Sequence, residues 1–199
     1  AIKPLGSIRI IDCPDINNIN GFKSLTKVNG DFIMKNTPKA AFTWGAGNCL
    51  NNLVEVTGDF TLDNATDQNL TGTTCLMSLA KVGGNFTITN INLKFWDLRD
   101  MPLTEIGGDF IYKDNALVNS FLGFGGLTKI GGKLLVKGTA ITDFSQVQTW
   151  IDNNVISADN VECYGTSGNR IIFNLPANYS LVGSKAVTEF VCLLACPLK

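Results

Sequence analysis

The chain of 199 residues contains no histidine. This absence excludes the serine–histidine–acid and cysteine–histidine arrangements of nucleophilic enzymes, and it removes the side chain that most often binds transition metals. Lysine and arginine number 16 against 17 aspartates and glutamates, so the formal net charge is −1. A protein that binds nucleic acid through phosphates carries a basic excess, so this balance argues against that class. We therefore expect no enzyme, no metal site and no cofactor.

Long apolar runs are also missing. A helix needs about 20 apolar residues to cross a bilayer, and the most apolar segment, 190–196, is too short. No signal-peptide pattern opens the chain, although a trimmed chain would not show one. None of the six cysteines forms a Cys-x-x-Cys pair, which argues against a zinc ribbon or a thioredoxin-like redox motif. The sequence thus predicts no transmembrane segment.

A repeated unit that begins with glycine dominates the sequence. Its glycines follow one another at spacings of 24, 28, 26, 24 and 24 residues. They are Gly6, Gly30, Gly58, Gly84, Gly108 and Gly132. A short run follows each glycine, and in it apolar and other residues alternate, as in a strand with one buried face. Gly interrupts every unit, so helices are excluded and stacked strands are expected.

Two columns of side chains are predicted to point inward when these strands stack. The first column contains Ile8, Phe32, Phe60, Phe86, Phe110 and Leu134. The second contains Ile10, Met34, Leu62, Ile88, Tyr112 and Val136. Rungs about 4.8 Å apart place like residues on like, so the phenylalanines should form a continuous spine.

Corners are predicted on both sides of each strand. The sixth residue after each glycine belongs to the types that tolerate a left-handed backbone. These residues are Asp12, Asn36, Asn64, Asn90, Asp114 and Gly138. The repeat glycine itself is expected to supply the preceding corner. Together these features predict a mostly β fold, a right-handed parallel β-solenoid of about six rungs of 24–28 residues over residues 1–155.

The pattern ends after Gly138. Residues 143–151 resemble a short amphipathic helix with Asp143 as its N-cap, and we expect this helix to cover the apolar end of the last rung. Residues 156–199 are either an extension of this cap in the same domain or the start of a truncated neighbour. Within them, residues 160–164 and 170–175 are two predicted strands, divided by a Gly-Thr-Ser-Gly turn.

Three units, at 79–90, 103–112 and 127–136, follow the form Leu-x-x-Ile/Val-Gly-Gly with a strand after it. They resemble the receptor L-domain repeat, and the resemblance covers about residues 5–155. That family includes the ligand-binding L domains of insulin-type and growth-factor-type receptors, fungal cell-wall proteins and surface proteins of gut bacteria. The resemblance implies a right-handed β-helix related to leucine-rich repeats, with a non-catalytic extracellular role. The chain lacks the receptors' cysteine-rich modules, which favours the microbial, Bacteroides-type branch.

Three groups of residues leave alternatives open. Asp31, Asp59 and Asp109 share the first outward column and are best interpreted as solvated corner residues, with a calcium site or carboxylate catalysis as alternatives. Cys49 and Cys75 share one repeat position and could form a disulfide or remain buried thiols. The pair at 192 and 196 could bond across one helical turn or stay free.

Candidate ligand-binding residues come from the second outward column and from one loop. The column is a flat, mildly apolar stripe, although an ordinary β surface has the same composition. Its candidates are Ile33, Thr61, Thr87, Ile111 and Leu135. Phe42, Leu70 and Trp96 fall six residues after the corner and are expected in the core. The loop aromatics Phe95 and Phe121 are more often core than ligand-binding, whereas Trp44 lies off this column and is expected to be exposed.

The sequence therefore favours a monomeric, extracellular binding or adhesion module, anchored at the cell surface, for instance by a lipid. Its ligand would be an unidentified protein or glycan. The alternatives are a carbohydrate-active β-helix enzyme and a purely structural surface spacer. An enzyme of that kind needs acids and basic groups in one groove, but the three arginines, Arg9, Arg99 and Arg170, lie in widely separated repeats.

Overall fold

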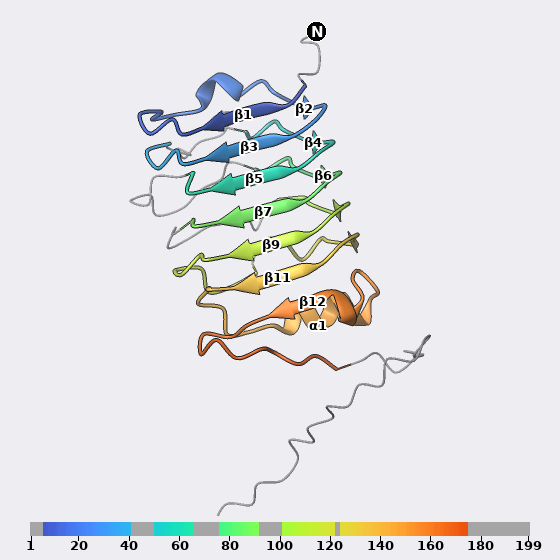
Figure 1. Ribbon diagram of the computed structural model, residues 1–199. Coiled ribbons are helices and arrows are strands. Elements are labelled where there is room, and N and C mark those ends of the chain that lie inside the picture. Colours follow the sequence, from blue (N-terminus) through green and yellow to red (C-terminus); the bar gives the residue numbers. More distant parts are fainter. Residues whose placement is uncertain (1–5, 41–49, 66–75, 92–100, 122–123, 175–199) are drawn as a thin grey trace, which may run out of the picture.

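The chain folds as a parallel β-solenoid with rungs of about 24 residues over about 5 turns and one short helix near the C-terminus. This arrangement is seen in a computed structural model (Figure 1), which describes residues 6–40, 50–65, 76–91, 101–121 and 124–174. The predicted fold class is confirmed. Among the described residues, no helix is both long enough and apolar enough to cross a membrane.

Among the described residues, five rungs each contribute one strand to a large sheet and one to a small sheet, and the large sheet has one further strand at each end. In the part of the chain that the structure describes, the large sheet has seven parallel strands in the order β1-β3-β5-β7-β9-β11-β12. Their bounds are β1 Ile8–Ile11, β3 Phe32–Lys35, β5 Phe60–Asp63, β7 Phe86–Thr89, β9 Phe110–Lys113, β11 Leu134–Lys137 and β12 Val161–Cys163. The described strands of the small sheet are β2 Lys27–Val28, β4 Glu55–Val56, β6 Lys81–Val82, β8 Glu105–Ile106 and β10 Lys129–Ile130.

The core lies between these sheets and follows the two predicted inward columns. Equal repeat positions pair directly, as in Phe32 with Phe60 and Phe60 with Phe86. The rings of these three phenylalanines are stacked, with centroids 5.4 and 5.3 Å apart. Side chains of both columns are fully buried from β3 to β11, whereas Ile8 and Ile10 in β1 are only partly buried because β1 has no described strand beyond it.

The predicted Asx corners are confirmed, and the repeat glycines from Gly30 to Gly132 lie at the bends before the strands, as expected. Asp12, Asn36, Asn64, Asn90 and Asp114 have φ between 47° and 57°, and Gly138 has φ 66°. By contrast, Gly58, Gly84, Gly108 and Gly132 do not have positive φ. Glycine is required there by crowding, because a Cβ on any of them would overlap the acidic or amide side chain and the backbone of the preceding rung.

The helix α1, Ser145–Asp152, covers the C-terminal end of the core with Val147, Trp150 and Ile151. It begins one residue later than expected, because Phe144 rather than Asp143 holds the N-cap position. The Asp143 carboxylate nevertheless accepts a hydrogen bond from the Ser145 N–H at 2.9 Å, which is an Asx turn leading into the helix.

The segment after α1 continues the large sheet. The 3₁₀ turn η2, Ala158–Asn160, leads into β12, which pairs with β11 and confirms the first of the two strands expected there. The prediction of a second strand is wrong within the described residues, where Arg170 forms only one antiparallel bridge, with Tyr164. Its chain instead turns toward α1, where the Asn174 N–H donates to Gln148 Oε1 at 3.0 Å.

At the opposite end, the 3₁₀ turn η1, Asn20–Phe22, lies between β1 and β2. Its Phe22 ring meets the Phe32 ring edge-on, with centroids 6.3 Å apart. The two ends of the stack therefore differ. Figure 1 shows the strands stacked from β1 to β12, with α1 against the C-terminal end.

Candidate functional site

The large sheet brings the predicted ligand-binding residues together in one row. This row, called here the central row, lies on five neighbouring strands in exact register. Its members are Ile33, Thr61, Thr87, Ile111 and Leu135. All are partly or nearly fully buried by their neighbours, and Thr61 is only 9% exposed. Arg9 in β1 and Glu162 in β12 continue the row at its two ends.

A polar row runs beside the central row toward the Asx corners. Paired in register, it consists of Ile11, Lys35, Asp63, Thr89, Lys113 and Lys137. Lys113 forms an ion pair with Asp114 at 3.0 Å, and Lys137 Nζ lies 5.4 Å from the centre of the Tyr164 ring. The face therefore combines a level apolar and hydroxyl-bearing centre with a charged margin, which can offer van der Waals contact and hydrogen bonds to a ligand.

The acidic column on the other side of the central row is a hydrogen-bonded ladder. Each side-chain oxygen accepts the backbone N–H of the residue at the same position in the next rung. The bonds run from Asp31 N to Ser7 Oγ (3.0 Å), Asp59 N to Asp31 Oδ1 (3.1 Å), Asn85 N to Asp59 Oδ1 (2.7 Å), Asp109 N to Asn85 Oδ1 (2.7 Å) and Lys133 N to Asp109 Oδ1 (2.7 Å). We call this the Asx ladder.

The Asx ladder explains the composition of its column. Ser, Asp and Asn interchange along it because each presents an oxygen acceptor, and Lys133 can end it because only its N–H is used. At Asp31 the pKa is lowered by the bond from the Asp59 N–H and by the Arg9 guanidinium, which lies 2.8 Å away. Within the residues that the structure describes, no group of three or more acids and cysteines is arranged to hold a metal ion.

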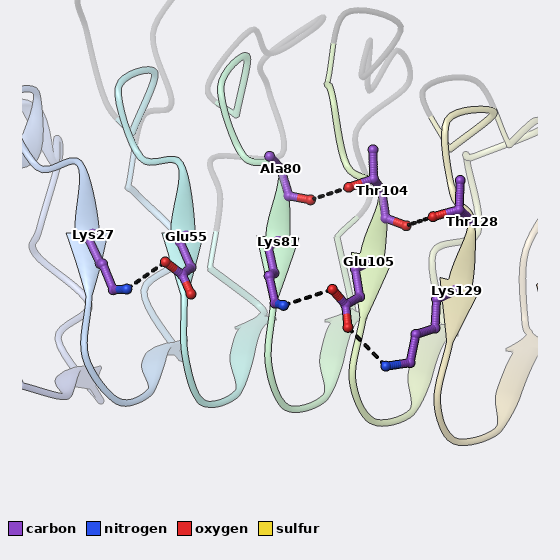
Figure 2. A network of polar contacts seen from close by, with 8 residues as sticks. All are labelled: Lys27, Glu55, Ala80, Lys81, Thr104, Glu105, Thr128 and Lys129. Carbon is purple, nitrogen blue, oxygen red and sulfur yellow. Dashed lines mark hydrogen bonds and ion pairs between the residues drawn. The ribbon is translucent and has the colours of Figure 1, made fainter.

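The small sheet carries a second ladder, made of charges of alternating sign (Figure 2). Its members are Lys27, Glu55, Lys81, Glu105 and Lys129, one on each strand in register. Ion pairs join Lys27 to Glu55 (2.6 Å), Lys81 to Glu105 (2.7 Å) and Lys129 to Glu105 (3.0 Å). Both lysine bonds lower the pKa of Glu105, and the Glu105 carboxylate raises the pKa of Lys81.

Sequence reasoning missed both ladders, although each had a signal. In the small sheet, the residue three positions before each repeat glycine alternates between Lys and Glu from Lys27 to Lys129. Beside it, the Thr104 hydroxyl donates to the Ala80 carbonyl at 3.2 Å and the Thr128 hydroxyl to the Thr104 carbonyl at 3.0 Å (Figure 2). In the large sheet, the signal was the run of Ser, Asp and Asn directly after glycine.

A shallow depression of about 350 Å³ lies at the Asx corners of the first rungs. Its lining residues are Asp12, Pro14, Asn36, Pro38 and Asn64. Inside it the Asn36 amide donates to Asp12 Oδ1 at 2.7 Å, so part of the polar lining is already paired. The sequence pattern assigns Asp12, Asn36 and Asn64 to corners only.

The remaining sequence candidates divide into core residues and residues outside the described ranges. Phe121 is 7% exposed and packs against Trp150, which confirms its core role. Among the described cysteines, Cys13 and Cys163 are free, and burial raises the pKa of Cys163 to about 12. The other predicted sites lie outside the described residues: Phe42, Trp44, Leu70, Phe95, Trp96, the pair Cys49 and Cys75, and the pair Cys192 and Cys196.

No protein-family model, curated protein or solved structure matches this chain. The parallel β-solenoid therefore rests on the repeat and on the structure themselves. The resemblance to receptor L domains stays a prediction from the repeat.

Proposed function

We propose that this chain is a binding or adhesion module of the receptor L-domain type that recognises a protein or glycan outside the cell. It acts without catalysis, as a monomer held at the cell surface. The observation that carries the proposal is the central row. Five aliphatic and threonine side chains lie in register across neighbouring strands and form a level surface that no described element covers.

The construction of the large sheet supports this use. The Asx ladder ties the start of each strand to the next rung, and the core columns beneath are fully buried. A face held in this way loses little conformational entropy when a ligand binds. More of the free energy of its contacts therefore contributes to affinity. Extended sheet faces of this kind are the common binding surfaces of repeat proteins.

The size of the face constrains the ligand. Seven strands about 4.8 Å apart, each about 13 Å long, give a face of about 400 Å². A stable protein interface needs about 800 Å² from each partner. The sheet face alone therefore suits a glycan or a peptide-sized epitope, and a larger protein ligand requires contacts from other parts of the chain.

The test compares two matched substitutions on opposite sheets. Ile111→Arg places a charge in the central row, whereas Val54→Arg places the same charge at a 46% exposed aliphatic position beside β4. Both proteins and the wild type are screened on glycan arrays and against purified extracellular proteins, and bound ligands are titrated. We expect the screens to identify a ligand. The Val54→Arg protein should bind it with the affinity of the wild type, and the Ile111→Arg protein should bind it at least about tenfold more weakly.

Absence of any ligand in these screens would favour the structural spacer. Equal binding by Ile111→Arg and the wild type would exclude the central row as the binding site. A polysaccharide cleavage assay on the same samples addresses the enzyme alternative. Turnover that is lost in Asp31→Asn and Asp59→Asn would contradict the proposal, because both changes keep the oxygen that the Asx ladder needs.

A further inference from the structure

The N-terminal end of the solenoid presents an edge strand with incompletely covered apolar side chains. β1 is the outermost strand of the large sheet in the part of the chain that the structure describes. Ile8 and Ile10 are partly exposed, whereas the side chains at these two positions in β3, β5, β7, β9 and β11 are at most 1% exposed. Phe22 is a further partly exposed apolar side chain at this end.

Backbone groups of β1 are also directed away from the sheet. The N–H groups of Ile8 and Asp12 donate to the carbonyls of Asp31 and Lys35 in β3, at 2.7 and 3.1 Å. In a parallel strand the alternate residues present their N–H and C=O groups to the other side. The groups of Arg9 and Ile11 therefore face outward, where the Ile11 carbonyl accepts a hydrogen bond from the Cys13 thiol at 3.3 Å. No proline in Ile8–Ile11 blocks the edge. An edge of this kind is a template for an added strand.

We propose that β1 docks an extended segment of a partner protein, which adds to the large sheet as a parallel strand. Continuity with the existing stack specifies the chemistry of this segment. Apolar side chains lie opposite Ile8 and Ile10, and Asp, Asn or Ser lies opposite Ser7. The Ser7 N–H donates to that side chain as the Asp31 N–H donates to Ser7 Oγ.

Charge adds a further condition on the partner segment. Arg9 is 59% exposed at its side chain and pairs with Asp31 on its inner side at 2.8 Å. An acidic side chain on the added strand would place Arg9 between two carboxylates. The small sheet already contains the inverse of this arrangement, because Glu105 pairs with a lysine on each side. The segment is therefore an acidic one with apolar residues at alternate positions.

A second copy of this chain fits the edge less well. Two β1 strands related by a two-fold axis pair in antiparallel fashion, in one of two central registers. The first register places Arg9 against Arg9 of the other copy, which is a repulsive contact. The second places Ile10 against Ile10 but Ile8 against Asp12, so half of the apolar column stays unmatched. A heterologous parallel strand avoids both conflicts.

The probe is a labelled peptide with the sequence of Gly58–Asn64, which contains the strand β5 of the chain itself. Its two acids lie in the outward columns of the sheet, and its Phe and Leu lie in the inward columns. Its binding to the whole chain is followed by fluorescence anisotropy. A control peptide has the same composition with the alternation shifted by one residue. We expect saturable binding of the first peptide, none of the control, and slower deuterium exchange of the β1 amides in the complex.

Two substitutions locate the binding. Arg9→Glu removes only an exposed ion pair, so the fold is retained and circular dichroism verifies it. We expect this variant to bind the acidic peptide about tenfold more weakly and to regain affinity for a peptide in which only the acid at the Asp63 position is changed to lysine, because the acid at the Asp59 position supplies the oxygen opposite Ser7. Ile10→Asp should abolish binding, and Ile10→Val should preserve it.

Ile111→Arg separates this edge from the proposed ligand-binding face, because it should leave peptide binding unchanged. The proposal fails if the peptide does not saturate, if the shifted peptide binds equally well, or if Arg9→Glu has no effect. It also fails if sedimentation shows a dimer of the chain that Ile10→Asp dissociates, since the occupant would then be a second copy.

Discussion

Single side chains of the Asx ladder take the place of a backbone partner at the start of each strand. Asp59 illustrates the geometry, because its Oδ1 accepts the Asn85 N–H at 2.7 Å while its own N–H is bound by Asp31. These N–H groups are only partly exposed, so an unpaired one loses a hydrogen bond that water replaces incompletely. The side-chain oxygen, rather than the charge, is what the position needs.

The substitutions Asp59→Asn and Asp59→Ala distinguish the contribution of the side-chain oxygen to stability from that of the carboxylate charge. Asp59→Asn keeps an acceptor and should change the free energy of unfolding by less than about 0.5 kcal/mol, whereas Asp59→Ala should lower it by about 1–2 kcal/mol. Urea unfolding followed by circular dichroism measures both. Equal losses in the two variants would show that the carboxylate charge matters more than the bond.

Asp31 should make stability depend on pH in the acid range. Its pKa is lowered in the folded state by the Asp59 N–H and by Arg9, so the ionised carboxylate stabilises the fold. That contribution is present above the ordinary value of 3.8 and is lost as the pH falls through the lower folded-state pKa. Thermal melts between pH 6 and pH 2 should therefore show a smaller acid destabilisation in Asp31→Asn than in the wild type. A steeper acid dependence in the variant would contradict this assignment.

At the scale of the element, each rung is defined by close approach to its neighbours. The repeat glycines bring successive backbones into contact, as in the bond from Gly84 N to the Gly58 carbonyl at 2.9 Å. The alternating lysines and glutamates of the small sheet also favour the correct order of strands. If one rung were skipped in the stack, lysine would lie beside lysine or glutamate beside glutamate. Its ion pairs are largely exposed and stabilise the fold only weakly.

The substitutions Gly58→Ala and Gly6→Ala test the close approach. A Cβ on Gly58 overlaps Asp31 and the Gly30 backbone, so this change should lower the free energy of unfolding by about 1–3 kcal/mol. A Cβ on Gly6 meets no atom within 4 Å, so its substitution should stay within about 0.5 kcal/mol. Chemical denaturation of the two variants gives the comparison. Similar losses at both positions would point to a conformational role for the glycine instead.

At the scale of the whole molecule, the two ends of the solenoid differ. α1 and the residues after it close the C-terminal end, where Trp150 packs against Phe110 and Phe121 with ring centroids 6.3 and 5.8 Å apart. The N-terminal end leaves β1 as an edge strand in the described part of the chain. Because each rung contacts only its neighbours, loss of one cap should loosen the nearest rungs first.

Trp150→Ala should remove about 3–5 kcal/mol of stability, since its side chain is 1% exposed. Deuterium exchange should quicken first in β11 and β12 and last in β3 and β5. Trp150→Phe should cost much less, because the indole N–H has no hydrogen-bond partner among the described residues and the aromatic contacts remain. Uniform acceleration across all strands in Trp150→Ala would show that the solenoid unfolds as one cooperative unit.

The repeat pattern alone determined the parallel β-solenoid, its inward columns and its Asx corners. Alternation, glycine spacing and tolerance of positive φ act within one rung, so they are visible in a linear sequence. Only the tertiary structure decided which polar and backbone atoms meet between rungs. The bond from the Asp59 N–H to Asp31, the overlap that forbids a Cβ on Gly58 and the pairing of Lys81 with Glu105 all join residues 24 to 28 positions apart. Such contacts depend on stacking distance and register, and these follow from packing rather than from any local pattern.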